Sequence, residues 1–175
     1  STRKESSAAS DVYKRQIKLL KDKKIKGIIN CPIKKETLFK NKHQGITEYL
    51  SKKLRKQGNE VMLIYNKKLS VCPVTTHIPL QKVSKVISKR NIIRCVKTIN
   101  NFYKTIFNIK PKFAVLGLNP HSYSPLKLSE EKKIISKSVN SIKKKKIKVI
   151  GPISPDTSFM NYKIYKFNVI IGMYH

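Results

Sequence analysis

The chain lacks the features that mark several large classes of protein. Its three cysteines, Cys31, Cys72 and Cys95, are widely spaced and form no CxxC pattern, which indicates reduced thiols rather than a disulfide framework or a cysteine-based metal site. No run of about 18 apolar residues occurs, and the N-terminus has no apolar signal-peptide core, so we expect neither a transmembrane helix nor secretion. These absences predict a cytoplasmic protein with no membrane partner.

Two nucleotide-binding fingerprints are also missing. Neither GxGxxG nor GxxxxGK[ST] is present in the sequence. These spacings supply the backbone amides that cradle phosphates in Rossmann and P-loop proteins. The sequence therefore does not indicate a Rossmann dinucleotide-binding protein or a P-loop nucleotide-binding protein.

Acidic residues are scarce, with nine Asp and Glu against 39 Lys and Arg and a net charge of +30. Such a charge is typical of nucleic-acid or anionic-surface binding. However, only five of the basic residues are arginine, the residue that sequence readers use for bidentate contacts. Because the lysines are spread over nearly every predicted helix, we favour solvated faces and expect no specific nucleic-acid partner. A basic nucleic-acid-binding module stays as a distant alternative.

Hydrophobic periodicity and turn residues predict helices that alternate with strands. Residues 1–16 are predicted to be a disordered or non-native tail, and residues 17–175 one α/β region. The predicted strands are residues 25–30, 60–65, 69–74, 113–117, 147–150 and 168–173. The predicted helices begin near residues 12, 47, 79, 91 and 129, and residues 66–68 form a hairpin turn. This order predicts a three-layer α/β sandwich with a mixed sheet.

Three of the four histidines, His77, His121 and His175, each follow a strand-like run. Ligands gather outside the carboxyl ends of strands in α/β sheets, and three imidazoles are a common ligand set for a divalent metal. A histidine in a loop is more often an ordinary polar surface group, so the spacing alone leaves both interpretations open. His43 follows no strand and is predicted to be exposed to solvent.

A few other polar residues are candidates for the same site. Asp156 follows a predicted strand and a Gly-Pro turn, where it could be a ligand, an orienting partner of a histidine or a helix cap. Lys34 and Lys35 follow the first predicted strand and could meet a phosphate. Cys31 is predicted to be a small buried apolar residue rather than a nucleophile.

Four loop segments, taken in order, carry a family resemblance. TTHIPL (75–80), GLNPH (117–121), GPISPDTSF (151–159) and GMYH (172–175) resemble the signature segments of the 4-hydroxythreonine-4-phosphate dehydrogenase, or PdxA, family of vitamin B6 synthesis. INCPIKK (29–35) and GITEYL (45–50) resemble two earlier segments, so the similarity covers about residues 25–175.

The resemblance implies a fold like that of isocitrate and isopropylmalate dehydrogenases, a homodimer, and NAD- or NADP-dependent oxidation of 4-phosphooxy-L-threonine, a small phosphorylated substrate. Decarboxylation would then give 3-amino-2-oxopropyl phosphate, on the way to pyridoxal 5'-phosphate. It also implies a divalent metal (Zn, Mg, Mn or Co). The family's metal ligands fall on His77, His121 and His175.

The remaining site residues follow from the same resemblance. The family's substrate-contacting His-Thr pair falls on Ile46 and Thr47, and Lys34 or Lys35 matches another substrate contact. Asp156 is the candidate catalytic residue. Residues 17–175 would then be the central metal-binding and dimer-forming part of the enzyme.

The departures from the family pattern leave a further alternative open. Ile46 stands where the family has a histidine, and SYSPLKL follows His121 in place of a small, Gly-rich, acidic loop. These changes favour a paralogue acting on another phosphorylated or four-carbon hydroxy acid. Family members continue past His175 with an Asp-Gln pair and the dinucleotide-binding segment, so we expect a fragment, incomplete at both ends and inactive as a dehydrogenase by itself.

Overall fold

The structure is a computed structural model that describes residues 2–30, 46–124 and 129–175, with side chains from residue 11 onward. The candidates Cys31, Lys34, Lys35 and His43 lie outside these residues. The chain divides into two compact units, residues 1–60 and residues 61–175. None of the helices in the described part of the chain is both long and apolar enough to cross a membrane.

The first unit is helical in its described part. Helix α1 (Thr2–Lys21) includes most of residues 1–16, for which the sequence predicts a disordered or non-native tail. Its first half contains Arg3, Lys4, Glu5 and two alanines, which favour helix, together with three serines. Its second half buries Tyr13 and Ile17 on one face, and the Tyr13 ring packs edge-on against Tyr49 at 6.2 Å between centroids. The sequence predicts this helix only from Val12, and the packed residues Tyr13 and Ile17 lie in that predicted part.

Two further predictions for this unit need correction. Residues 25–30 form no strand, and Ile29 is 98% exposed. A strand needs a neighbour for its backbone groups, and the described residues of this unit contain no other strand. Helix α3 (Ile46–Lys53) begins one residue before Thr47, so Thr47 lies inside the first turn instead of capping the helix.

The second unit is built on a four-stranded sheet in the order β1-β4-β2-β3. Every pairing between these strands is parallel, so the predicted mixed sheet is wrong. The predicted strand at 60–65 is reduced to one antiparallel bridge between Ile64 and Val71. The sheet strands are β1 (Ser70–Pro73), β2 (Phe113–Leu116), β3 (Val149–Ile153) and β4 (Val169–Gly172).

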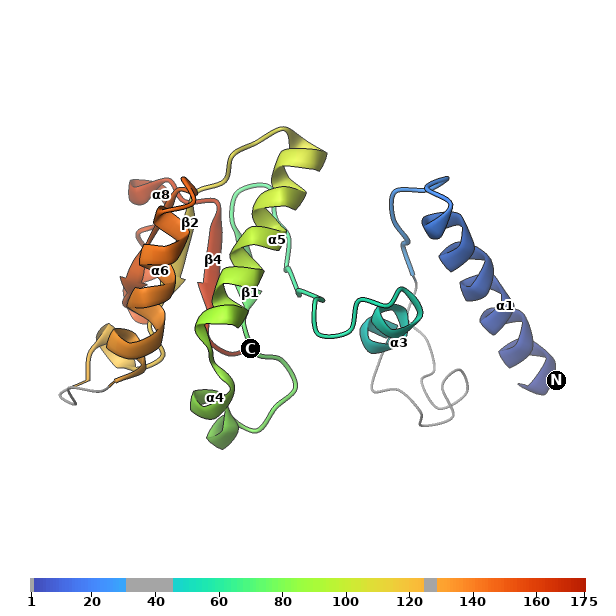
Figure 1. Ribbon diagram of the computed structural model, residues 1–175, viewed down its shortest axis with the longest axis horizontal. Helices are drawn as coiled ribbons and strands as arrows, with labels where there is room; N and C mark the ends of the chain where they lie inside the picture. Colours follow the sequence, from blue (N-terminus) through green and yellow to red (C-terminus); the bar gives the residue numbers. More distant parts are fainter. Residues whose placement is uncertain (1, 31–45, 125–128) are drawn as a thin grey trace. The chain divides into compact units, whose positions relative to one another are not determined.

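Helices connect successive strands, which is why the strands run parallel. In Figure 1, α5 and α6 lie over the same side of the sheet. Residues 155–158, which lie in a segment predicted as loop, form a one-turn helix, and residues 162–165 form another. The connecting elements are α4 (Leu80–Val86), α5 (Lys89–Phe107), η1 (Pro120–Ser122), η2 (Glu131–Ile135), α6 (Ser136–Lys143), α7 (Pro155–Ser158) and α8 (Tyr162–Tyr165).

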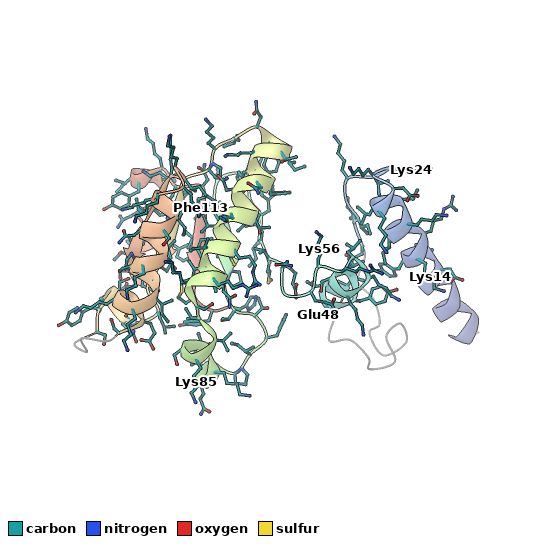
Figure 2. All side chains as sticks on the ribbon, viewed as in Figure 1. Lys14, Lys24, Glu48, Lys56, Lys85 and Phe113 are labelled. Carbon is teal, nitrogen blue, oxygen red and sulfur yellow. The ribbon has the colours of Figure 1, made fainter. Side chains whose placement is uncertain are left out.

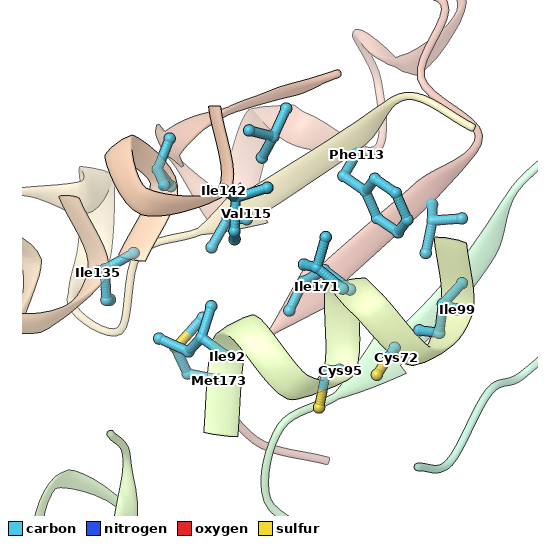
Figure 3. Close-up of a cluster of buried hydrophobic side chains, with 14 of the residues drawn as sticks. Cys72, Ile92, Cys95, Ile99, Phe113, Val115, Ile135, Ile142, Ile171 and Met173 are labelled. Carbon is cyan, nitrogen blue, oxygen red and sulfur yellow. The ribbon is translucent and has the colours of Figure 1, made fainter. Parts of the chain in front are cut away.

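Both faces of the central strands are buried. Phe113 and Val115 of β2 point into the larger core beneath α4, α5 and α6, together with Ile171 of β4 (Figure 3). Ala114 and Leu116 face the other side, where Phe167 and Tyr162 pack. This burial explains the continuous apolar run FAVL, which is typical of parallel strands.

The two cysteines within the described residues, Cys72 and Cys95, lie in the larger core and are free thiols. Cys72 comes from β1 and Cys95 from α5, and both are almost fully buried. The expectation of reduced, non-disulfide cysteines therefore holds for this pair.

Candidate metal centre

The parallel sheet places four candidate residues at one edge. His77 follows β1, His175 follows β4, His121 follows β2 and Asp156 follows β3. The carboxyl ends of parallel strands all meet at the same edge of a sheet. The order β1-β4-β2-β3 therefore makes the histidine-bearing segments immediate neighbours, although they are dozens of residues apart in sequence.

His77 and His175 are brought face to face at this edge. Their ring centroids lie 6.1 Å apart, with 31° between the ring planes. Two residues before each histidine, the Thr75 hydroxyl donates a hydrogen bond of 2.8 Å to the Met173 carbonyl oxygen. This buried bond ties the two strand ends together and so fixes the spacing of the imidazoles.

A pocket of about 380 Å³ opens beside the two rings. Its walls combine polar groups from the strand ends with apolar side chains from the start of α4. Leu80 is 70% exposed despite its apolar character, so the pocket has an open, partly apolar rim. The lining residues are Thr75, His77, Ile78, Leu80, Val83, Tyr174 and His175.

His121 takes a different partner. Its Nδ1 lies 2.8 Å from Asp156 Oδ2, across the neighbouring ends of β2 and β3. The pair is exposed, with side-chain exposures of 77% for His121 and 47% for Asp156. Of the three alternatives for Asp156, the structure supports an orienting partner of a histidine. Asp156 also accepts a hydrogen bond from the Ser154 hydroxyl.

The backbone at two of these histidines is unusual. His77 and His121 both have φ of 54°, and Ser122 has φ of 52°. Left-handed backbone costs a residue with a side chain about 1–2 kcal/mol. Such strained conformations persist where surrounding contacts enforce them.

Sequence reasoning missed one residue that organises the His121 turn. The sequence places Glu131 in the first turn of a helix, where its charge would complement the dipole. In the structure its buried carboxylate instead accepts hydrogen bonds from the backbone amides of Leu118 and Asn119, at 3.0 and 2.9 Å. Burial would raise the pKa of Glu131, but the hydrogen bonds from Asn119 and Leu118 outweigh it and lower the pKa.

Two of the three expected ligands lie near each other. The ring centroids of His77 and His175 are 6.1 Å apart, and both residues line the same pocket. The described residues contain no group of three or more His, Cys, Asp or Glu that could hold a metal. The expected three-histidine cluster is thus not assembled among the described residues, where His121 lies beside Asp156 instead.

Thr47, the expected substrate contact, is an exposed residue of α3 in the first unit. Lys34 and Lys35 lie outside the described residues, so both contacts stay predictions.

The lysines of the described segments do not gather at one element. Lys14 lies on α1, Lys56 follows α3 and Lys85 lies on α4, and all three are exposed (Figure 2). Exposed lysines on several separate elements are typical of helix faces that contact water. The expectation of no specific nucleic-acid partner stays a prediction.

Comparison with known proteins gives the same family as the loop segments described above. The family model "Pyridoxal phosphate biosynthetic protein PdxA" matches residues 1–175. A 4-hydroxythreonine-4-phosphate dehydrogenase from Sulfurihydrogenibium is 38% identical over 100% of this chain and 55% of its own length. A D-threonate 4-phosphate dehydrogenase from Pectobacterium atrosepticum is 34% identical over 86% of this chain and 47% of its own.

Solved structures show the same relationship. A 4-hydroxythreonine-4-phosphate dehydrogenase from Klebsiella pneumoniae superposes with a TM-score of 0.84 and 27% identity, over 97% of this chain and 53% of that chain. A putative enzyme of the same name from Salmonella typhimurium gives 0.86 and 29%, with the same coverage. The chain spans about half the length of the curated relatives it matches. On these grounds the chain belongs to the PdxA family.

Proposed function

We propose that this chain forms the metal-binding part of a dehydrogenase that oxidises 4-phosphooxy-L-threonine with NAD or NADP and decarboxylates the product to 3-amino-2-oxopropyl phosphate. The observation that carries the proposal is the pairing of His77 and His175 at the carboxyl edge of the sheet. Relatives of the family bear the name of this dehydrogenase. The homodimer, the cytoplasmic location and the likeness to isocitrate and isopropylmalate dehydrogenases stay predictions.

In this proposal, His77 and His175 hold a divalent ion with their ring nitrogens. The bound ion would lower the pKa of the substrate hydroxyl and stabilise negative charge on the product's carbonyl oxygen. The Thr75–Met173 hydrogen bond keeps the two strand ends in register. The same bond therefore keeps both imidazoles available on one side of the pocket.

His121 and Asp156 are proposed to act together. Because the Nδ1 of His121 faces the Asp156 carboxylate, Nε2 is left as the nitrogen that can meet the ion or the substrate. The carboxylate fixes the orientation of the ring. Thr47, Lys34 and Lys35 are proposed to contact the substrate, with the lysines meeting its phosphate.

Metal titration tests the proposal directly. We expect the chain to bind Co²⁺ with the absorption of a histidine-bound ion, and His77→Ala or His175→Ala to weaken binding by at least about tenfold, the scale on which altered metal surroundings act. His43→Ala is the matched control, since His43 follows no predicted strand. Equal binding by all four proteins would contradict the proposal.

A second substrate has specific support. A relative named D-threonate 4-phosphate dehydrogenase is 34% identical, and Ile46 stands at the position where the family resemblance places a histidine. Initial rates of NADH formation from the two phosphorylated substrates, measured with the product of the complete gene, separate these candidates. Restoring the histidine with Ile46→His should raise the rate with 4-phosphooxy-L-threonine if Ile46 limits its use.

A further inference from the structure

Glu131 is a buried acid in a strongly basic protein. Its residue exposure is 4%, although the chain carries 39 Lys and Arg against nine Asp and Glu. Its carboxylate has no cationic partner within 4 Å in the part of the chain that the structure describes. A buried carboxylate needs hydrogen bonds to offset the loss of water, and Glu131 obtains them from the turn after β2.

The contacts concentrate on two consecutive residues of that turn. Oε1 accepts from the Leu118 amide at 3.0 Å, from the Asn119 amide at 2.9 Å and from Asn119 Nδ2 at 3.1 Å. Oε2 accepts from Asn119 Nδ2 at 2.9 Å. Hydrogen bonds to an ionised acceptor are about twice as strong as neutral ones. The carboxylate therefore clamps both the backbone and the side chain of the turn.

The clamped turn leads directly into strained backbone. His121 and Ser122 are both left-handed. Ser122 folds back onto Gly117, where a Cβ would lie 2.8 Å from the Ser122 Cα. Left-handed residues with side chains relax unless their neighbours hold them. Glu131, fixed at the start of η2, supplies such a hold immediately before His121.

We propose that Glu131 is a positioning residue, whose carboxylate holds the Leu118–Asn119 turn and thereby sets where the His121 imidazole lies beside Asp156. The first part of this proposal, that Glu131 holds the turn, is argued from the hydrogen bonds alone. Its consequence for metal binding rests on the proposed function, in which Nε2 of His121 is free to meet the ion or the substrate. The competing interpretation of Glu131, as an acid that only stabilises its own helix, predicts no change in the turn when the charge is removed.

Amide hydrogen exchange measured by NMR tests the structural part. Glu131→Gln keeps the size of the side chain but replaces the ionised acceptor, and its amide NH₂ group faces the donor Nδ2 of Asn119. We expect exchange at the Leu118 and Asn119 amides to accelerate by about tenfold, because the variant replaces a charged acceptor with a neutral and weaker one. Amides of β4 should keep their wild-type rates, which separates local loosening from general destabilisation.

Glu130→Gln is the matched control, since Glu130 is the neighbouring acid and makes only one long contact of 3.4 Å to Asn119. The ring resonances of His121 should shift in Glu131→Gln and stay in place in Glu130→Gln. Unchanged exchange at both amides, an unmoved His121 ring, or the same effect in both variants would overturn the proposal. If Glu131→Gln does not fold, Asn119→Ala must accelerate exchange at Leu118, and an unchanged rate there would overturn the proposal as well.

A Co²⁺ titration separates this proposal from the proposed function. If His121 is a ligand, His121→Ala and Glu131→Gln both weaken Co²⁺ binding, the latter by about tenfold. Wild-type affinity in Glu131→Gln, alongside weakened binding in His121→Ala, would overturn the positioning role. Wild-type affinity in His121→Ala itself would count against the role of His121 in the proposed function, while the exchange data would still decide the role of Glu131.

Discussion

The imidazole Nδ1 of His121 lies 2.8 Å from the Asp156 carboxylate, between the ends of two neighbouring parallel strands. The sequence predicts Asp156 only as one of several kinds of group, among them an orienting partner of a histidine, and does not say which histidine it meets. The pair makes His121 the one histidine of the three whose orientation is set by a carboxylate within the described residues.

Replacing Asp156 should affect ligand binding more than stability. Asp156→Asn removes the charge facing His121, but an exposed ion pair contributes only about 0–1 kcal/mol to stability. We expect the melting temperature to change by less than about 4 °C, while Co²⁺ affinity falls by up to about tenfold. Calorimetry and metal titration of the same preparation check both. A large loss of stability would show that the contact is chiefly structural.

The Thr75 hydroxyl should matter more than that of its neighbour Thr76. Thr75→Val keeps the shape of the side chain but leaves the Met173 carbonyl without its buried donor, at a cost of about 1–3 kcal/mol. We expect urea denaturation to show that loss and Co²⁺ binding to weaken, because the His77 and His175 strand ends separate. Thr76→Val, in a less buried residue, is the control. Equal effects of both substitutions would argue against a specific role for the hydrogen bond between Thr75 and Met173.

A methyl group at Gly117 should disturb the His121 turn. The added Cβ would come within 2.8 Å of the Ser122 Cα and also meet the Ser122 side chain, so the backbone of the turn must move. Overpacking of this kind typically costs about 1–3 kcal/mol. Gly117→Ala should therefore lower the denaturant midpoint and shift the His121 ring resonances. Gly27→Ala, where the added group meets nothing within 4 Å, is the control.

Acid should destabilise the protein partly through Glu131. Its pKa is lowered in the folded state, so its stabilising contribution is full above the unfolded value, near 4.3, and is lost as the pH falls through the lower folded value. Because the pKa of Glu131 is higher in the unfolded protein, the unfolded state binds the proton more readily in acid, which favours unfolding. Urea denaturation between pH 6 and pH 3 should show a steeper loss of stability in the wild type than in Glu131→Gln. Parallel curves would contradict this assignment.

Local pattern was sufficient for the strands that carry the site. The runs FAVL and the segment at residues 168–173 are apolar on both sides and end at glycine, so their burial and their carboxyl ends could be predicted. The strand expected at residues 25–30 failed because an apolar run does not by itself provide a pairing partner. The prediction of a mixed sheet was wrong because the turn at residues 66–68 joins segments that form only one antiparallel bridge. The direction of the remaining strands depends on which strands pair, and local sequence does not specify that.

The role of Glu131 could not be predicted, because an acid at the start of a helix satisfies a local rule by itself. Only the fold shows that the turn after β2 lies within reach of its carboxylate. The sequence offered one indication, the small number of acidic residues, nine in all. If one of these is buried, its carboxylate needs hydrogen-bond donors in the fold.

The sequence by itself determined the family, the positions of the strand ends and the histidines that follow them, because these depend on residue type and order along the chain. Tertiary structure alone decided which of those histidines meet. His77 and His175 face each other because β1 and β4 are adjacent and tied through Thr75, whereas His121 lies beside Asp156 because β2 borders β3. Which strands are adjacent in a sheet is decided by strand pairing, and it cannot be predicted from the separation of the strands in sequence.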